Sequence, residues 1–198
     1  EGLPGAQALV GVDGAIHALG KDGRLSSADR IGDSWGAPRS REVKSVAAAS
    51  RFLTSVGPDA VVLDRDSQTL HLPGRDVVDP SFVDGVLQIP GEIAESVTVA
   101  TPTELLVVSL GDGEIRRISS GVSARGVPVA PVVLGGCRYA AWAGVGRYIR
   151  DCPGEADDVA QGVEKLRTAK NLVFRTNRDV VVINDTNNGD VFLASKQV

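Results

Sequence analysis

The segment "NDTNNGDVFL" (184–193) contains residue types that bind calcium. Asp185, Asn187 and Asp190 place oxygen atoms close together in the sequence, and Ca²⁺ is coordinated by carboxylate and amide oxygens. An EF-hand loop starting at Asp185 would need glycine at its sixth position and glutamate at its twelfth, and it has neither. Asn, Asp and Gly between two apolar runs are also typical of a β-hairpin tip. We therefore expect a hairpin turn here, with a calcium site as the alternative.

Acidic residues near predicted turns could also serve a glycan hydrolase, which uses a pair of carboxylates on either side of the bond that it cleaves. Nothing in the sequence shows that any two of these acids converge, and turn chemistry accounts for each of them. The chain has only eight aromatic residues, two of them tryptophan, whereas sugar sites usually stack sugars on aromatic rings. We expect no catalysis and keep glycan hydrolysis as an alternative. The acids considered are Asp64, Asp66, Asp112, Asp185 and Asp190.

The two histidines do not form a recognisable catalytic or metal-binding motif. His17 and His71 lie between apolar neighbours in "AIHAL" and "TLHLP", as core or surface strand residues do. There is no HExxH motif and no phosphate-binding loop. We expect a structural role for both histidines and no cofactor.

The two cysteines fit a disulfide inside one hairpin. If Gly144 and Val145 form a two-residue turn, Cys137 lies directly opposite Cys152. Opposed residues of an antiparallel pair have Cα atoms about 4.5–5.5 Å apart, which a disulfide can bridge. Two reduced thiols in a cytosolic protein are the alternative. A disulfide favours an oxidising, extracytoplasmic compartment.

The same hairpin register makes two further predictions. Arg138 would face Asp151 as an opposite-charge pair, and Trp142 would face Arg147 in a cation–π contact.

A pattern of strand, short turn, strand, short turn, strand occurs five times, as in "QALVGV-DG-AIHALG-KDG-RLSSA". The second turns are separated by 45, 45, 33 and 43 residues. The middle strands are rich in Val, Leu and Ile, which is expected when both faces of a strand are covered. The segment 157–169, "DDVAQGVEKLRTA", is either one short helix or a charged strand. The units span about 6–28, 51–73, 96–119, 130–153 and 171–195, and their second turns lie near Asp22, Ser67, Asp112, Val145 and Asn188.

Triplets at this period, with room for a fourth strand in each connection, are typical of β-propeller blades. We therefore predict an all-β, single-domain β-propeller over residues 1–198. Its five or so blade-like units have three or four antiparallel strands each. An immunoglobulin-type sandwich or two small β domains are the alternatives. The sequence leaves open whether the ring closes, stays open, belongs to a larger ring or is completed by a second copy.

Composition and charge limit the kinds of partner that the chain could bind. A net charge of −4 and a pI of about 5.2 argue against nucleic acid. The longest uncharged run, Gly126–Cys137, is 12 residues with two prolines, too short to cross a bilayer. The chain contains no methionine, and we interpret it as an internal fragment of a longer protein.

Three segments carry a resemblance to a known family: "VVLDRDSQTLHLPG", "LGGCRYAAWAGVGRYIRDCPG" and "LVFRTNRDVVVINDTNNGDVFL". They resemble the N-terminal propeller-like region of very large actinobacterial cell-surface proteins that carry fibronectin type III or Ig-like repeats. The resemblance covers roughly residues 50–195. It implies an extracellular module anchored by a segment outside this chain, and it supplies no catalytic residues.

We therefore expect a non-catalytic interaction or scaffold module of a bacterial surface protein, which binds a protein or glycan on host or neighbouring cells. A calcium-dependent adhesive domain and a glycan hydrolase are the alternatives. Binding would use one end of the blades, at the turns near Asp22, Ser67, Asp112 and Asn188. The fifth unit shows only three strands, and an unpaired strand edge invites a homodimer.

Overall fold

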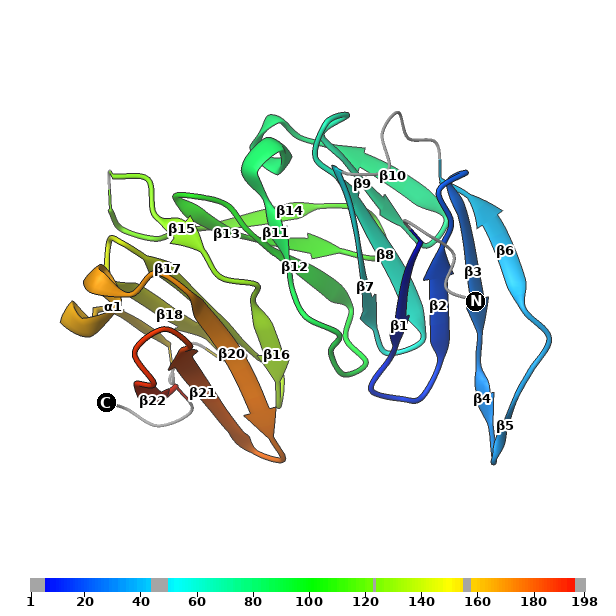
Figure 1. Ribbon diagram of the computed structural model, residues 1–198. Coiled ribbons are helices and arrows are strands. Elements are labelled where there is room, and N and C mark those ends of the chain that lie inside the picture. The colour runs from blue at the N-terminus through cyan, green and yellow to red at the C-terminus, as the bar shows by residue number, and fades with distance from the viewer. Residues whose placement is uncertain (1–5, 44–49, 123, 155–157, 195–198) are drawn as a thin grey trace.

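A computed structural model describes residues 6–43, 50–122, 124–154 and 158–194. Five antiparallel β-sheets follow one another along the chain and stack side by side, from the blue N-terminal sheet to the red C-terminal sheet (Figure 1). We call them blades 1 to 5. The all-β prediction is confirmed. No helix within these ranges is long and apolar enough to span a membrane.

The blades contain three to five strands each. Blade 1 consists of β1 (Gln7–Val10), β2 (Ile16–Leu19), β3 (Arg24–Ala28) and β6 (Arg39–Glu42). Blade 2 consists of β7 (Arg51–Val56), β8 (Asp59–Asp64), β9 (Thr69–Leu72) and β10 (Arg75–Val78). Blade 3 consists of β11 (Val86–Leu87), β12 (Ser96–Ala100), β13 (Glu104–Ser109) and β14 (Ile115–Ser119). Blade 4 consists of β15 (Val127–Pro128), β16 (Val132–Leu134), β17 (Cys137–Ala143), β18 (Arg147–Asp151) and β19 (Val159–Gly162). Blade 5 consists of β20 (Leu172–Asn177), β21 (Val180–Asp185) and β22 (Val191–Leu193).

The remaining elements are short. A two-stranded ribbon, β4 (Arg30–Ile31) with β5 (Ser34–Trp35), projects from blade 1 (Figure 1). A 3₁₀ helix (Pro80–Asp84) links blades 2 and 3. The segment predicted as either a helix or a charged strand contains both, because β19 is followed by α1 (Glu164–Thr168).

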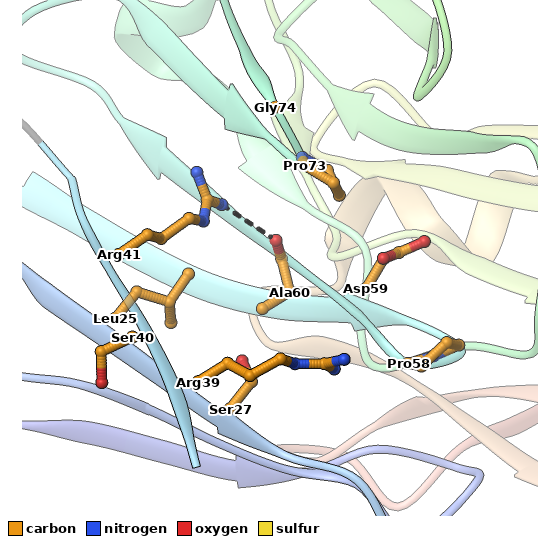
Figure 2. A pocket seen from close by; sticks show the side chains of 10 residues that line it. All are labelled: Leu25, Ser27, Arg39, Ser40, Arg41, Pro58, Asp59, Ala60, Pro73 and Gly74. Carbon is orange, nitrogen blue, oxygen red and sulfur yellow. Dashed lines mark hydrogen bonds between the residues drawn. The ribbon is translucent and has the colours of Figure 1, made fainter.

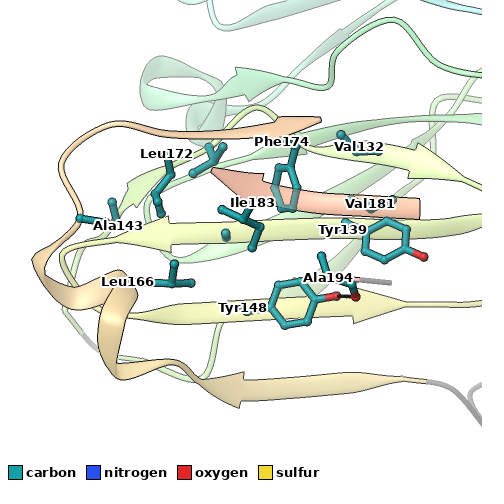
Figure 3. Close-up of a cluster of buried hydrophobic side chains, with 13 residues drawn as sticks. Val132, Tyr139, Ala143, Tyr148, Leu166, Leu172, Phe174, Val181, Ile183 and Ala194 are labelled. Carbon is teal, nitrogen blue, oxygen red and sulfur yellow. Dashed lines mark hydrogen bonds between the residues drawn. The ribbon is translucent and has the colours of Figure 1, made fainter. Parts of the chain in front are cut away.

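The stacking of the sheets explains why the middle strands are so apolar. In β17, Ala140 and Trp142 pack in one cluster with blade 3, while Tyr139, Ala141 and Ala143 pack in another with blade 5 (Figure 3). Successive side chains of a strand point to opposite faces, so such a strand is buried on both sides. This arrangement rules out the sandwich alternative for these blades, since a two-sheet sandwich buries only one face of each sheet.

Four apolar layers join the five blades, one between each neighbouring pair. Blades 1 and 5 lie at opposite ends of the row (Figure 1). Their outer faces carry exposed apolar side chains, including Val10 in blade 1 and Val191 in blade 5. The described residues therefore form an open arc. They do not close into a five-bladed ring, which was one of the arrangements that the sequence allowed.

Blade 3 differs from the others in how the predicted triplet is placed. β7 contacts both β1 and β11, and a parallel bridge links Val56 to Gly91, just beyond β11. β1, β7 and β11 are therefore the equivalent first strands of their blades. The triplet β12–β14 consequently forms strands two to four, whereas in the other blades the triplet forms strands one to three.

This shift corrects the prediction that the four turns proposed for binding all lie at one end of the blades. Antiparallel strands alternate in direction, so a turn between strands three and four lies at the opposite end from a turn between strands two and three. Asp112 follows strand three of blade 3 and contacts Arg75, at the β9–β10 turn of blade 2. It lies at the end that holds the β7–β8 and β9–β10 turns, which we call the first-turn end. Asp22, Ser67 and Asn188 lie in turns between strands two and three, at the other end.

The predicted hairpin register in blade 4 is present. Cys137 and Cys152 form a disulfide with Cα atoms 4.1 Å apart, and Arg138 pairs with Asp151 across the strands. Trp142 also faces Arg147, but the predicted cation–π contact is wrong. The indole is buried and donates from Nε1 to the carbonyl oxygen of Thr101 at 2.6 Å, while the guanidinium of Arg147 lies beside Gly121.

Asp151 joins blades 3 and 4 electrostatically. Its carboxylate accepts from Arg116 of β14 at 2.7 Å and from Arg138 of β17 at 3.1 Å. Burial acts to raise the pKa of Asp151, but the hydrogen bonds and charges of Arg116 and Arg138 outweigh it and hold the pKa below its usual 3.8.

We predict that Asp151→Asn lowers the free energy of unfolding by about 1–3 kcal/mol at pH 7, since it removes hydrogen bonds between charged groups. A lowered folded-state pKa stabilises the protein above the unfolded pKa, and this contribution is lost as pH falls through the folded pKa. The difference between variant and wild type should therefore shrink below pH 3.8. Urea unfolding across pH measures it. Asp33→Asn, in the exposed turn of the β4–β5 ribbon, serves as the control, and an equal loss there would contradict the assignment.

Candidate functional site

The calcium candidates form the turn between β21 and β22. Asp185 is buried, and its two carboxylate oxygens accept hydrogen bonds from the Asn187 backbone N–H at 3.0 Å and from Asn188 Nδ2 at 2.8 Å. Its backbone N–H donates to the carbonyl oxygen of Asp190 at 2.8 Å. The carboxylate that would lead a calcium site is thus engaged by the turn itself. Within the described ranges, no three His, Cys, Asp or Glu side chains cluster as a metal site.

The same use of aspartate recurs in other blades. In each case the carboxylate accepts a hydrogen bond from the backbone N–H two residues later, which closes a tight turn. The recurring arrangement shows that these aspartates are turn-forming residues. The residues are Asp13, Asp22, Asp64 and Asp112, with distances of 3.1, 3.0, 3.0 and 3.0 Å.

The acids considered for glycan hydrolysis do not come together in a common pocket. Asp64 and Asp66 lie at the β8–β9 turn of blade 2. Asp112 lies in blade 3, at the opposite end of the strands, and Asp185 and Asp190 lie in blade 5. None of the five lines any of five pockets found among the described residues.

Each histidine has a cross-strand partner that the sequence reasoning missed. His17 Nδ1 lies 2.8 Å from Ser27 Oγ, and His71 Nδ1 lies 2.8 Å from Asp76 Oδ1. The register would have found both: a hairpin centred on Asp22 sets His17 opposite Ser27, and the turn after Leu72 sets His71 opposite Asp76.

The Ser27–His17 pair lacks the third group of a nucleophilic triad. An orienting acid would bind the far nitrogen of the ring, but His17 Nε2 is buried and has no hydrogen-bond partner among the described residues. Burial lowers the pKa of His17, against the opposing effect of Asp13 and other nearby acids. His17 is a neutral core residue that holds the Ser27 hydroxyl in place.

A groove between blades 1 and 2 is a better candidate for a binding site than the turn aspartates or the histidines. It has a volume of about 270 Å³ and lies at the first-turn end, between β3 and β6 of blade 1 and the β7–β8 and β9–β10 turns of blade 2 (Figure 2). Its walls combine two arginines, two serines, an aspartate and two prolines over an apolar floor. The lining residues are Leu25, Ser27, Arg39, Ser40, Arg41, Pro58, Asp59, Ala60, Pro73 and Gly74.

Arg41 is the charged residue of this groove whose side chain is held by hydrogen bonds to the neighbouring blade. Its half-buried side chain reaches from β6 to blade 2, where Nη2 donates to the carbonyl oxygens of Ala60 at 3.2 Å and of His71 at 3.4 Å (Figure 2). Burial lowers the pKa of Arg41, while Asp76 and Asp59 act in the opposite direction. Among the described residues, no carboxylate lies within 4.0 Å of its guanidinium nitrogens.

The sequence pattern does not predict this groove. None of its ten residues stands out in the sequence, because a polar residue in a short strand such as "RSRE" of β6 resembles any residue of an exposed edge strand. The available signal was two arginines two residues apart, which share one face of a strand.

Similarity to solved structures agrees with the arrangement of the sheets. The chain superposes on virginiamycin B lyase from Staphylococcus aureus with a TM-score of 0.58 and 12% identity, covering 89% of this chain and 61% of that one. It superposes on the WD40 domain of Neurospora crassa Pan2 with a TM-score of 0.52 and 13% identity, covering 94% of this chain and 59% of that one. The fold is that of a β-propeller.

A third structure, Kluyveromyces lactis Hsv2, matches with a TM-score of 0.50 and 12% identity over 90% of this chain and 59% of that one. The propeller arc thus spans about three fifths of the length of these proteins. No family model matches the sequence, and no curated protein does. At identities this low, the likeness concerns the fold alone.

Proposed function

We propose that this propeller arc is a non-catalytic binding module of a bacterial cell-surface protein, and that it attaches to a protein or glycan on host or neighbouring cells. The observation that carries the proposal is the groove between blades 1 and 2. It is open and polar, and it holds a half-buried arginine without a carboxylate partner among the described residues. The turn aspartates, by contrast, are engaged within their own turns.

Two further features support this setting. The Cys137–Cys152 disulfide suits an oxidising environment, as on a cell surface. The sequence resemblance to large actinobacterial surface proteins points to the same compartment. A propeller named as a lyase is among the structural neighbours, so the fold itself is compatible with catalysis. The non-catalytic part of the proposal is therefore supported by the positions of the acids considered for glycan hydrolysis, which do not share a pocket.

The test compares binding with turnover. The purified chain is applied to an array of glycans and surface proteins, and each ligand that binds is then incubated with the chain and analysed for cleavage products. We expect retention of a ligand, unchanged when EDTA replaces calcium, with no product. Release of new reducing ends would overturn the non-catalytic assignment in favour of a hydrolase. Loss of binding in EDTA would favour the calcium-dependent alternative.

A further inference from the structure

We propose that the groove between blades 1 and 2 binds a carboxylate group of the ligand, with Arg41 as the main contact. The inference rests on the proposed binding function and names the ligand chemistry for the groove. Its starting point is an arginine that has no carboxylate within 4.0 Å among the described residues.

A half-buried guanidinium is costly unless an anion or a full set of hydrogen bonds compensates it. The two carbonyl oxygens that Arg41 contacts engage only Nη2. Arg41 Nε and Nη1 have no partner among the described residues, although Arg41 lines the groove. A guanidinium binds a carboxylate through two parallel N–H···O bonds, so these donors suit a carboxylate that enters the groove.

Several other arginines of the arc pair with carboxylates. Arg116 and Arg138 both pair with Asp151, and Arg117 pairs with Asp79 and Glu104. The pair of Arg116 with Asp151 links blade 3 to blade 4, while Arg138 pairs with Asp151 within blade 4. Arg41 also bridges two blades, but through carbonyl oxygens, which carry no full charge to neutralise it.

The charges in the groove favour a singly charged anion. Arg39 and Arg41 supply two positive charges and Asp59 supplies one negative charge. The residues that line the groove therefore sum to about +1, two positive charges less one negative. Arg39 is exposed and also pairs with Asp29 at 2.7 Å, which leaves Arg41 as the arginine available to a ligand. A phosphate carries about −1.5 to −2 at pH 7, so Asp59 would repel it more strongly than it repels a carboxylate. A carboxylate matches the groove better.

The other lining groups indicate what the carboxylate is attached to. The Ser27 hydroxyl can donate to or accept from a ligand hydroxyl, and the Asp59 carboxylate can accept from one. Pro58 and Pro73 form stiff walls. A volume of about 270 Å³ suits one small residue rather than a long ligand. A sugar acid meets these requirements, and a peptide C-terminus shares its carboxylate chemistry.

Calorimetric titration and thermal unfolding of the whole chain test the assignment. The probes are glucuronate, its uncharged relative glucose, N-acetyl-alanylalanine with its C-terminal amide as control, and inorganic phosphate. We expect glucuronate to bind and to raise the melting temperature, while glucose does neither. The peptide pair shows whether any carboxylate suffices or a sugar is required.

Variants assign the binding to Arg41. Arg41→Gln should weaken glucuronate binding at least tenfold, whereas Arg125→Gln, which removes an exposed arginine paired with Asp84 on another part of the arc, should leave it unchanged. Asp59→Asn should tighten binding about two- to fivefold, because it removes a repulsive charge. This second variant keeps the test valid if Arg41→Gln unfolds.

The outcomes that overturn the inference are distinct from those that overturn the proposed function. Equal affinity for glucuronate and glucose, tighter binding of phosphate than of any carboxylate, or full binding by Arg41→Gln would each refute the carboxylate site. If the array finds a ligand that Arg41→Gln still binds, the binding function stands without this site. If a carboxylated glycan binds and is cleaved, the site stands and the non-catalytic function fails.

Discussion

Replacing Trp142 with alanine is expected to lower the free energy of unfolding by about 3–5 kcal/mol, the range for deleting a large aromatic side chain from a core. The indole is fully buried between blades 3 and 4, with Leu105 and Ile149 in the same cluster. Its Nε1 donates to the carbonyl oxygen of Thr101, so the substitution also leaves a buried acceptor without its donor. A loss of this size would consume much of the stability of a typical domain.

Trp35 supplies the matched control. It projects on the β4–β5 ribbon, is 52% exposed and donates to the carbonyl oxygen of Gly14 at 3.0 Å. Trp35→Ala should cost about 1 kcal/mol or less. Urea unfolding measures both variants, and Trp35→Phe leaves Trp142 as the only tryptophan, so its fluorescence reports the interface between blades 3 and 4. Equal losses for the two alanine variants would contradict the stacked arrangement of the blades.

Removing the disulfide is expected to destabilise the chain by about 3 kcal/mol, because Cys137 and Cys152 are 15 residues apart and the link restricts the unfolded chain. For a chain of this size, that corresponds to a fall in melting temperature of roughly 6–12 °C. Calorimetry of Cys137→Ser/Cys152→Ser, compared with the wild type with and without reductant, measures it.

The controls separate the bond from the side chains. The reduced wild type and the double variant should melt together, and reductant should not affect the double variant. Two free thiols in the untreated protein, found by mass spectrometry, would contradict the disulfide and weaken the argument for an extracytoplasmic compartment.

The arc joins two kinds of polar group that have different roles. Aspartates such as Asp22 and Asp185 stabilise the turns within a single blade. Arginines such as Arg116 and Arg41 reach from one blade to the next. Binding chemistry is therefore expected between blades, where two sheets supply different walls, and not at the turn tips where the sequence analysis first located it.

The sequence by itself determined the local features of this protein. Strand triplets, turn aspartates and the register that pairs Cys137 with Cys152 follow from alternating side chains and turn preferences over a few residues. The same local reasoning would have paired His17 with Ser27. It could not recognise β11, since a two-residue strand has no periodicity, and it consequently placed Asp112 at the wrong end.

Only the tertiary structure decided which blades contact each other and what lies between them. The open arc, the position of Trp142 against Thr101 and the groove around Arg41 depend on residues far apart in the chain. The physical reason is that stacking is governed by shape and by buried area over whole sheet faces, whereas sequence patterns report only which face of a strand is apolar. A face known to be apolar must be covered, but its pattern does not name the sheet that covers it.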